Sequence, residues 1–467
     1  MAKRKKYTLE NMLIETYAAE GKCIARHDNK VIFVEGAVPG DVADLFVHRS
    51  KKDWAEAMVS RIVSFSPDRV DAFCSHFGIC GGCKWQMLPY EKQLSYKDQQ
   101  VKDQLRRIGK VEVGTYLPIK GSAQIREYRN KLEFTFSNKR YLTHADLQKD
   151  LSFDQNVVGF HAPRLFDKVI DIDTCHLQSE PTNEIRNFIR TFALERGYTF
   201  YDIRLHQGLL RTLIIRLSSL NEVLVNLVFG EDHPENIQEM MTAIQTEFPQ
   251  ITSLNYTINL KANDTIYDQD VICFSGKEYI EEKLEDFRFK ISPKSFFQTN
   301  TQQATELYRI VREFAECKGH EILYDLYCGT GSIGIFLSGG VQKIIGVETV
   351  DDAIQDARIN ADWNGLAHAE FYTGDVIKIC NDEFFRKHGS PDVVIIDPPR
   401  AGCHDTLIEK LLEMKAPVMV YVSCNPATQA RDLQLLASAY EVTLSQAVDM
   451  FPHTHHIENV VQLKLKK

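Results

Sequence analysis

One cysteine of the sequence stands where a nucleophile could reach a substrate. Cys424 follows an apolar run in Val420-Tyr-Val-Ser-Cys-Asn-Pro426. The run predicts a buried strand, and ligands of open α/β sheets bind at the carboxyl ends of such strands. A thiolate at this edge would be a strong nucleophile. Most lone buried cysteines have no chemical role, so the interpretation of Cys424 depends on the residues around it.

A carboxylate near the C-terminus could act as a base. Glu458 follows His453, His455 and His456 between two strand-like runs. The three histidines could belong to a metal site or a solvated loop, but their spacing is not a standard zinc signature. A carboxylate that is partly desolvated in a cleft gains the basicity that proton abstraction needs. We therefore interpret Glu458 as a general base.

A glycine-rich turn could hold a cofactor. Gly329, Gly331 and Gly334 lie between a predicted strand and a predicted helix, where glycine allows a ligand to approach the backbone. Glu348 closes the next strand, and a carboxylate there can accept both hydroxyl groups of a ribose. On spacing alone the turn also fits a dinucleotide fingerprint or an ordinary strand-to-helix connection.

An Asp-Pro-Pro turn ends a later strand. Asp397 follows the apolar residues 393–396, and Pro398 and Pro399 stiffen the backbone after the carboxylate. The turn could place the carboxylate at the ligand edge of the sheet, or it could simply begin a helix.

Four cysteines have the composition of a metal centre. Cys74, Cys80 and Cys83 lie in one glycine-rich loop, and Cys175 could supply a fourth sulfur. Zinc and a four-iron cluster both accept four thiolates, so ligand spacing does not separate them. A loop of free thiols is the remaining interpretation.

The elements that would carry these residues fall into three groups. Residues 7–65 read as short strands, among them 31–34, 41–47 and 57–63, with Gly and Pro turns, which is typical of a small β-barrel. A helix is expected around Tyr90–Ile108. Strands such as 131–136 and 212–217 then alternate with helices near 180–196 and 234–247, an α+β pattern.

The C-terminal part shows a different pattern. A helix is expected after Ser292-Pro293, through Glu316. Strand-like runs then alternate with helices, which predicts a parallel sheet covered on both faces; the runs are 321–326, 343–348, 369–373, 392–397 and 417–423. We expect three domains, a β-barrel over 1–66, an α+β domain over 67–290 and an α/β domain over 291–467.

Composition limits the class of protein. The 467 residues are 44% hydrophobic and 25% charged, which is typical of globular chains. No signal peptide or membrane-length apolar run is found, and the eleven cysteines are too few for a disulfide scaffold, so we expect a soluble cytoplasmic protein. The net charge of −9 weighs against a nucleic-acid partner, although basic segments such as residues 3–6 and Arg126 to Lys131 remain available.

Taken together, the motifs resemble the bacterial RNA uracil-5-methyltransferases that carry an N-terminal TRAM domain. The similarity is greater to the iron-sulfur ribosomal RNA branch than to the transfer RNA branch. It extends over almost the whole chain and rests on six motifs in order: Tyr128-Arg-Asn-Lys-Leu-Glu-Phe134, Ser295-Phe-Phe-Gln-Thr-Asn300, Asp325-Leu-Tyr-Cys-Gly-Thr-Gly331, Ile396-Asp-Pro-Pro-Arg400, Val422-Ser-Cys-Asn-Pro426, and Asp449-Met-Phe-Pro452 with His456 and Glu458.

The resemblance implies a role for each site residue. The fold would be a TRAM (OB-like) β-barrel, a central α+β domain with an iron-sulfur loop, and a Rossmann-like class I methyltransferase domain. Cys424 would be the nucleophile that adds to uracil, and Glu458 would remove the C5 proton. The contacts to S-adenosylmethionine would be Gln298, Tyr327, Ser332, Glu348, Asp375 and Asp397. A four-iron, four-sulfur cluster, with zinc as the alternative, would be held by Cys74, Cys80, Cys83 and Cys175.

Two of these contacts and the substrate are less constrained. Members of the family often carry asparagine at the position of Ser332, and the residue at Asp375 varies. RNA is the implied partner, with ribosomal RNA favoured and transfer RNA possible, and we expect a monomer that forms 5-methyluridine.

Three other functions use part of the same pattern. A nicotinamide-dependent oxidoreductase would use the glycine turn and Glu348, but it gives Cys424 and Asp397 no shared purpose. An amino-methyltransferase would use Asp-Pro-Pro to bind an exocyclic amine, but it needs no nucleophilic cysteine. A non-enzymatic RNA-binding protein would need none of the reactive residues.

Overall fold

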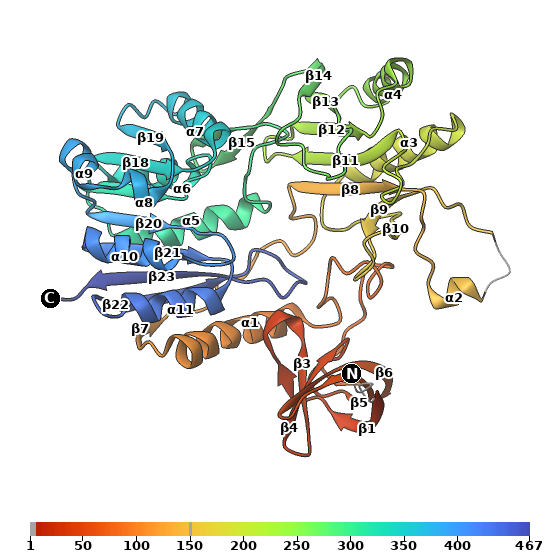
Figure 1. Ribbon diagram of the computed structural model, residues 1–467, viewed down its shortest axis with the longest axis horizontal. Helices are drawn as coiled ribbons and strands as arrows, with labels where there is room; N and C mark the ends of the chain where they lie inside the picture. Colours follow the sequence, from red (N-terminus) through yellow and green to blue (C-terminus); the bar gives the residue numbers. More distant parts are fainter. Residues whose placement is uncertain (1–5, 149–151) are drawn as a thin grey trace.

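The computed structural model describes residues 6–148 and 152–467, so the basic residues 3–5 lie outside the described part. The chain forms three sheet-containing units, an N-terminal barrel, a central sheet and a C-terminal sheet, and the barrel lies below the other two in Figure 1. Across the described ranges, no helix is long and apolar enough to cross a membrane.

The N-terminal barrel is a six-stranded sheet in the order β1-β5-β6-β4-β3-β2. Its core consists of residues that alternate along the strands, many of them small, such as Ala43, Ala55 and Ala57. The three strands predicted within residues 31–63 are confirmed. The bounds are β1 Tyr7–Leu13, β2 Thr16–Tyr17, β3 Cys23–His27, β4 Lys30–Glu35, β5 Val42–Ser50 and β6 Trp54–Ser64.

The central unit is a seven-stranded sheet in the order β10-β9-β8-β11-β12-β13-β14. Helices α3 (Thr182–Glu195) and α4 (Pro234–Glu247) pack on one face and confirm the two helices predicted there. The strands are β8 Lys131–Ser137, β9 Val157–His161, β10 Val169–Asp171, β11 Leu210–Leu217, β12 Val223–Phe229, β13 Ser253–Ile258 and β14 Val271–Gly276; a short helix, α2 His144–Leu147, lies between β8 and β9.

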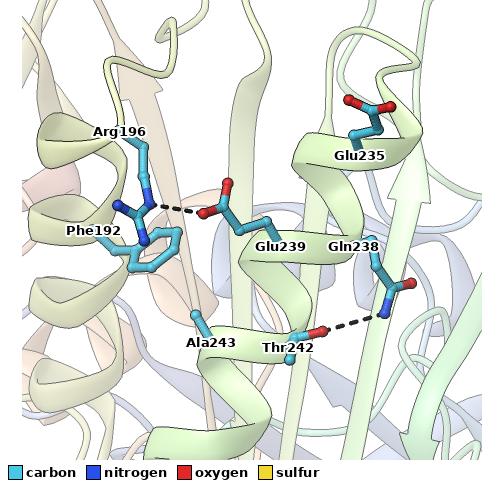
Figure 2. A pocket seen from close by; sticks show the side chains of 7 residues that line it. All are labelled: Phe192, Arg196, Glu235, Gln238, Glu239, Thr242 and Ala243. Atoms are coloured by element: carbon cyan, nitrogen blue, oxygen red, sulfur yellow. Dashed lines mark hydrogen bonds and ion pairs between the residues drawn. The ribbon is translucent and has the colours of Figure 1, made fainter.

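A shallow hollow of about 430 Å³ separates α3 and α4 on the outside of this unit (Figure 2). Arg196 and Glu239 form an ion pair of 2.8 Å across it, and Gln238 donates a hydrogen bond to Thr242. None of the residues that line it is predicted to belong to the active site.

The C-terminal unit is an eight-stranded sheet in the order β19-β18-β17-β20-β21-β23-β22-β7. The five predicted strands are confirmed as a parallel set, and β23 runs antiparallel to β21 and β22. The bounds are β17 Ile322–Leu326, β18 Lys343–Glu348, β19 Ala369–Thr373, β20 Val393–Ile396, β21 Val418–Ser423, β22 Tyr440–Val448 and β23 Glu458–Leu465.

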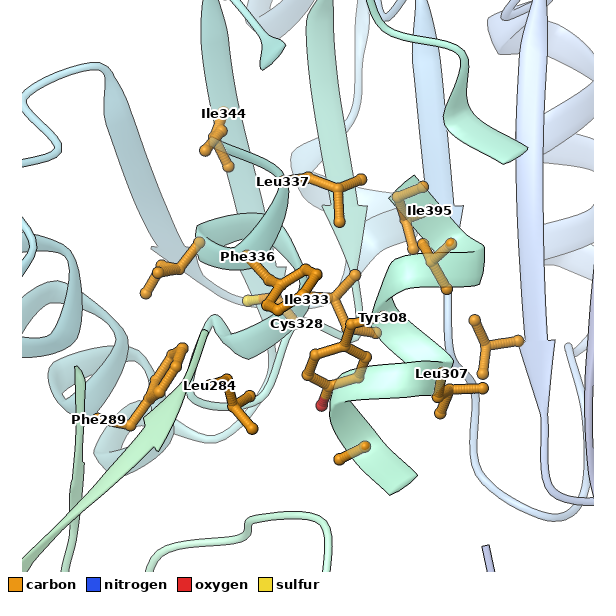
Figure 3. Packing of buried hydrophobic residues seen from close by; sticks show 14 of the residues in the cluster. Leu284, Phe289, Leu307, Tyr308, Cys328, Ile333, Phe336, Leu337, Ile344 and Ile395 are labelled. Atoms are coloured by element: carbon orange, nitrogen blue, oxygen red, sulfur yellow. The ribbon is translucent and has the colours of Figure 1, made fainter. Parts of the chain in front are cut away.

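Helices cover both faces of this sheet because successive strand residues point to opposite sides. Leu323, for example, packs with α5 and α6, whereas Tyr324 packs with the layer of α10 and α11. Figure 3 shows the first of these cores, with Leu307, Tyr308 and Phe336 between helix and sheet. The helices are α5 Thr301–Ala315, α6 Ser332–Leu337, α7 Asp351–Trp363, α8 Val376–Ile379, α9 Asp382–His388, α10 Asp405–Met414 and α11 Pro426–Leu436; a hairpin of β15 Ile280–Leu284 and β16 Phe287–Ile291 precedes α5.

The helix predicted directly after Ser292-Pro293 begins later than expected. Residues 292–300 are irregular, and Asn300 caps α5 by accepting a hydrogen bond from the Gln303 amide at 3.2 Å. An asparagine side chain satisfies an amide that the first helical turn leaves free, so the helix starts after it. The motif that contains Gln298 therefore lies in a loop.

Two early elements belong to the C-terminal sheet layer. Strand β7 (Val113–Tyr116) pairs in parallel with β22, Val113 opposite Val442. Helix α1 (Tyr90–Gln104), which confirms the helix predicted there, packs its buried Val101 into the core beneath α11. The boundaries at residues 66 and 290 remain a prediction, whereas sheet pairing joins residues 113–116 to the last unit.

Candidate active site

The strand register brings Cys424 beside Glu458. Strands β21 and β23 are antiparallel, with Val422 opposite Val460 and Ser423 opposite Asn459. Strand β21 ends at Ser423, and Cys424 follows it in a bend, one residue beyond the last pair of the ladder. Glu458 is the first residue of β23, and its charge acts on the Cys424 thiol. The two residues predicted to react are therefore neighbours at the edge of the sheet.

The electrostatics of this pair favour a protonated thiol and a strongly basic carboxylate. Burial, followed by the charges of Glu458 and Asp397, raises the pKa of Cys424 to about 11, while Arg400 acts in the opposite direction. Glu458 is buried, and its pKa is raised well above that of an ordinary glutamate by burial and then by Asp397. A carboxylate in this state holds a proton firmly once it has taken one.

Asp397 joins the same group from the neighbouring strand. It follows β20, whose last residue Ile396 is paired with Leu326 on one side and Tyr421 on the other. Burial raises the pKa of Asp397 to about 7. The carboxyl ends of β17, β20 and β21 therefore meet around one polar position, as in other open parallel sheets.

Side-chain hydrogen bonds fasten the Asp-Pro-Pro turn to the cysteine turn. The Asn425 amide donates to the Arg400 carbonyl at 3.0 Å, and the Thr428 hydroxyl donates to the same oxygen at 3.2 Å. The Asn425 side chain also accepts from the Ala427 amide and so caps α11. One asparagine thus fixes the start of α11, the cysteine turn and the loop after Asp397.

Two of the three C-terminal histidines have hydrogen-bond partners, and the ring of the third, His455, packs against His456. His453 is hydrogen-bonded to Gln93, and His456 Nδ1 lies 2.7 Å from Arg400 Nη2. Burial lowers the pKa of His453 and His456 to about 4 and that of His455 to about 3. A neutral His456 can accept a hydrogen bond from Arg400. The sequence analysis includes Arg400 in a motif but assigns it no role.

The glycine turn forms an open cradle after β17. Tyr327 and Gly331 have φ angles of 63° and 76°, so the backbone turns sharply away from the strand. A Cβ on Gly331 would lie 2.9 Å from Phe371 Cε1, whereas a Cβ on Gly329 would meet no atom within 4 Å. The Gly329 amide donates to Glu348 at 3.3 Å. Asp325 Oδ1, under the turn, is buried without a hydrogen-bond partner.

The other three predicted cofactor residues make hydrogen bonds within the protein. The Ser332 hydroxyl lies 2.9 Å from the Tyr308 hydroxyl. Asp375 caps α8 by accepting from the Ile377 amide at 3.0 Å. The carbonyl of Gln298 accepts from the Asn130 side chain at 2.9 Å, which ties the loop before α5 to the central unit.

The four predicted ligand cysteines line one cavity of about 310 Å³ in the central unit, together with Arg129 and His176. All four are free thiols. Burial raises the pKa of Cys80 to about 11 and of Cys83 to about 12. As placed in the described ranges 6–148 and 152–467, no three His, Cys, Asp or Glu side chains are grouped closely enough to hold a metal ion. The structure gathers the cysteines around one space without forming a finished ligand set.

Two family comparisons cover both ends of the chain. Residues 204–466 match the tRNA (uracil-5-)-methyltransferase family, and residues 8–59 match the TRAM domain. The second match falls on the six-stranded barrel.

Full-length relatives agree with these matches. An uncharacterized RNA methyltransferase of Bacteroides thetaiotaomicron is 52% identical over 453 residues, covering 96% of this chain and all of the relative. One from Chlorobaculum tepidum is 37% identical over 458 residues, covering 96% and 95%. The crystal structure of Pyrococcus abyssi tRNA (uracil-54, C5)-methyltransferase with S-adenosyl-L-homocysteine matches with a TM-score of 0.75 and 31% identity, covering 97% of this chain and 99% of that one.

Proposed function

Because the chain belongs to the tRNA (uracil-5-)-methyltransferase family of S-adenosylmethionine-dependent RNA methyltransferases and carries a TRAM domain, we propose that it methylates carbon 5 of uracil in RNA. The observation that supports the proposal is the pairing of β21 with β23, at whose end Cys424 and Glu458 lie close enough for the charge of Glu458 to act on the thiol. An amino-methyltransferase or an oxidoreductase would have no use for that pair.

The reaction needs both residues because C5 of uracil is a poor nucleophile. The Cys424 thiolate adds to C6, and the ring becomes an enolate. C5 then takes a methyl group, and S-adenosylmethionine, when bound, supplies that group as an electrophile on a sulfonium. Glu458 removes the C5 proton, the bond between C6 and sulfur breaks, and the Cys424 thiolate is released.

The turn after β17 fits an adenosyl cofactor. Gly329 leaves open space where a side chain would lie, and Glu348 ends β18 beside it with a carboxylate that can accept ribose hydroxyls. We assign Gln298, Tyr327, Glu348 and Asp397 to cofactor contacts. Ser332 and Asp375 are assigned with them, although each already has a partner within the protein.

We propose ribosomal RNA as the substrate, with transfer RNA as the alternative. The four cysteines around one cavity support the ribosomal branch, whereas the similar Pyrococcus abyssi enzyme acts on transfer RNA. Mapping 5-methyluridine in both RNA classes from a strain that lacks the gene decides between them. Loss from 23S ribosomal RNA is expected, and loss from transfer RNA alone would reverse the choice.

We propose that Cys74, Cys80, Cys83 and Cys175 hold a four-iron cluster, with zinc as the alternative metal. Four thiolates on one cavity match the donor set of either. The proposal requires the loop of Cys74–Cys83 to close further around the cavity than it does here. The metal would support structure, since no step of the proposed reaction transfers an electron.

The mechanism is tested by two substitutions with methyl-labelled cofactor. We expect Cys424→Ala to abolish methyl transfer while cofactor binding stays within a few-fold, because the thiol is assigned no contact with the cofactor. Glu458→Gln should add and methylate but fail to eliminate, so label remains on the denatured protein after nuclease digestion. The double variant is the control and should hold no label. Normal turnover by either single variant would refute the mechanism.

A further inference from the structure

The segment that leads to Glu458 is held by contacts from distant parts of the chain. Residues 449–457, called here the base loop, connect β22 to the first residue of β23, which is Glu458. A connection of this length at a sheet edge is ordinarily mobile. Here most of its residues are buried.

A buried ion pair fixes the start of the base loop to α1. Lys97 Nζ lies 2.6 Å from Asp449 Oδ1, and both side chains are fully buried. Lys97 also donates to the Phe451 carbonyl at 3.2 Å, and the Tyr90 hydroxyl donates to Asp449 Oδ2 at 2.9 Å. Buried charges are costly unless paired and hydrogen-bonded, and these are. The pair therefore specifies one position of the loop relative to α1.

The middle of the base loop is fixed by the same helix. Gln93 accepts a hydrogen bond from the His453 amide at 2.9 Å, and its own amide lies 3.1 Å from His453 Nδ1. The amides of Lys84 and Trp85 both donate to the His453 carbonyl, at 2.8 and 3.0 Å. His453 has a φ of 64°, a conformation that these four contacts hold in place.

The barrel touches the base loop from the other side. Gly21 lies in a turn of the barrel, with a φ of 70°, and a Cβ there would lie 3.0 Å from His455 Cβ and 3.4 Å from Trp85 Nε1. The His455 ring packs against the His456 ring at 4.2 Å between centroids. His456 in turn contacts Arg400 beside the reacting pair. Any side chain at Gly21 would make a tight contact with His455, in a backbone conformation that favours glycine.

We propose that α1 and the barrel turn clamp the base loop, so that Lys97, Gln93 and Gly21 are positioning residues for proton removal by Glu458. The inference rests on the proposed function, because it takes Glu458 to be the base. It adds that the barrel supports the catalytic step as well as any RNA contact. A misplaced Glu458 would slow elimination while leaving addition and methyl transfer intact.

The test separates elimination from the earlier steps. The probes are total RNA from a strain that lacks the gene, and the same RNA from cells grown with 5-fluorouracil. Fluorine at C5 cannot leave as a cation, so the second RNA holds the adduct whatever Glu458 does and reports addition and methyl transfer alone. The variants are Lys97→Met and Gly21→Ala. The control is Gly36→Ala, also in the barrel at positive φ (83°), where a Cβ would meet no atom within 4 Å.

With ordinary RNA, the labelled adduct of Lys97→Met should decay about 10- to 100-fold more slowly than that of wild type, because small misplacements of a reacting group have large effects. The adduct of Gly21→Ala should decay about threefold more slowly. The decay is followed by the label that remains on the protein when it is denatured. Adduct formation with fluorinated RNA should stay within about twofold of wild type for both. Gly36→Ala should release label at the wild-type rate.

The proposal would be overturned if the variants formed less adduct with both RNAs, to the same extent, and released the label at the wild-type rate. The three residues would then have a purely structural role. If Lys97→Met does not fold, the comparison of Gly21→Ala with Gly36→Ala decides, and equal release rates overturn the inference. Failure of Glu458→Gln to retain label is a separate result that refutes the proposed function itself.

Discussion

At the scale of single residues, the proposed reacting pair combines a thiol whose pKa is raised by burial and by Glu458 with a carboxylate whose pKa is raised by burial and by Asp397. Cys424 has a pKa of about 11, so little thiolate exists at neutral pH before RNA binds. Arg400 opposes the two carboxylates and lowers the pKa of both reacting groups. The proposed reaction therefore requires that binding of the base favours the thiolate, and Arg400 is the cation that lowers the pKa of Cys424.

The effect of the Glu458 charge on Cys424 can be measured through the alkylation rate of the thiol. An ionised Glu458 disfavours the thiolate, so Glu458→Gln should lower the pKa of Cys424 below about 11 and increase its alkylation by iodoacetamide, most of all at the alkaline pH where Glu458 has lost its proton. The rate is followed by mass spectrometry of the Cys424 peptide. Glu348→Gln, which removes a carboxylate that does not act on Cys424, should leave the rate unchanged. Slower alkylation in Glu458→Gln would reverse the sign assigned to this interaction.

Sequence reasoning could find these residues but not their contacts. Cys424 is predicted because it ends a strand-like run, and Glu458 because it is a carboxylate in a polar segment between two such runs. Their side-by-side placement depends on the β21–β23 register, which no local pattern encodes. Lys97 was missed for a related reason, since a lysine in a helix rich in Lys and Gln gives no sign that it is fully buried.

At the scale of elements, apolar runs predicted the parallel strands well because both faces of such a sheet are buried. The same rule explains why strand β7 was missed: Val113-Gly-Thr-Tyr116 is a partly exposed edge strand and has no apolar run. The late start of helix α5 has another cause, since the side chain of Asn300 caps its first turn.

Close packing between β18 and the cofactor turn gives a prediction for one glycine. A Cβ on Gly346 would lie 2.7 Å from Phe371 Cε1 and 3.0 Å from Cys328 Sγ, just behind the turn at Gly329. Gly346→Ala should cost about 1–3 kcal/mol of unfolding free energy, as overpacked cores do, and should weaken S-adenosylmethionine binding. Denaturant unfolding and calorimetric titration measure the two effects. Gly339→Ala, whose Cβ would meet no atom within 4 Å, is the matched control, and equal behaviour of the two variants would contradict the packing argument.

At the scale of the whole molecule, the cysteine cavity is connected to the base loop. Phe73, next to Cys74, contacts the ring of His176, next to Cys175, at 5.5 Å and the ring of His453 at 5.1 Å. The guanidinium carbon of Arg126 lies over the ring of Phe73, 3.8 Å from its centroid. A change in the cysteine loop can therefore reach both the central sheet and the segment that carries Glu458.

We expect protein purified without oxygen to be brown and to hold about four irons per chain. Cys80→Ser should be colourless, less soluble and weaker in RNA binding, because metal binding to the folded state contributes folding free energy. Cofactor binding should change less, since the cradle lies in another sheet. Iron analysis, gel shifts and calorimetry measure these effects, with Cys273→Ser, a cysteine outside the cavity, as control. Stoichiometric zinc without iron would refute the cluster and keep a four-thiolate site.

Strand β7 also bears on how the chain is made. It leaves the ribosome early, yet its partner β22 lies more than 300 residues further along, so the last sheet cannot be completed until synthesis is nearly finished. Until then the central sheet can fold while the C-terminal sheet, whose strands lie on both sides of it in the sequence, is still incomplete. The molecule thus resembles a methyltransferase core with a second domain inserted into it, rather than three domains in a row. A fragment that starts at residue 291 would lack both α1 and β7 and would leave β22 as an open sheet edge, a known site of aggregation.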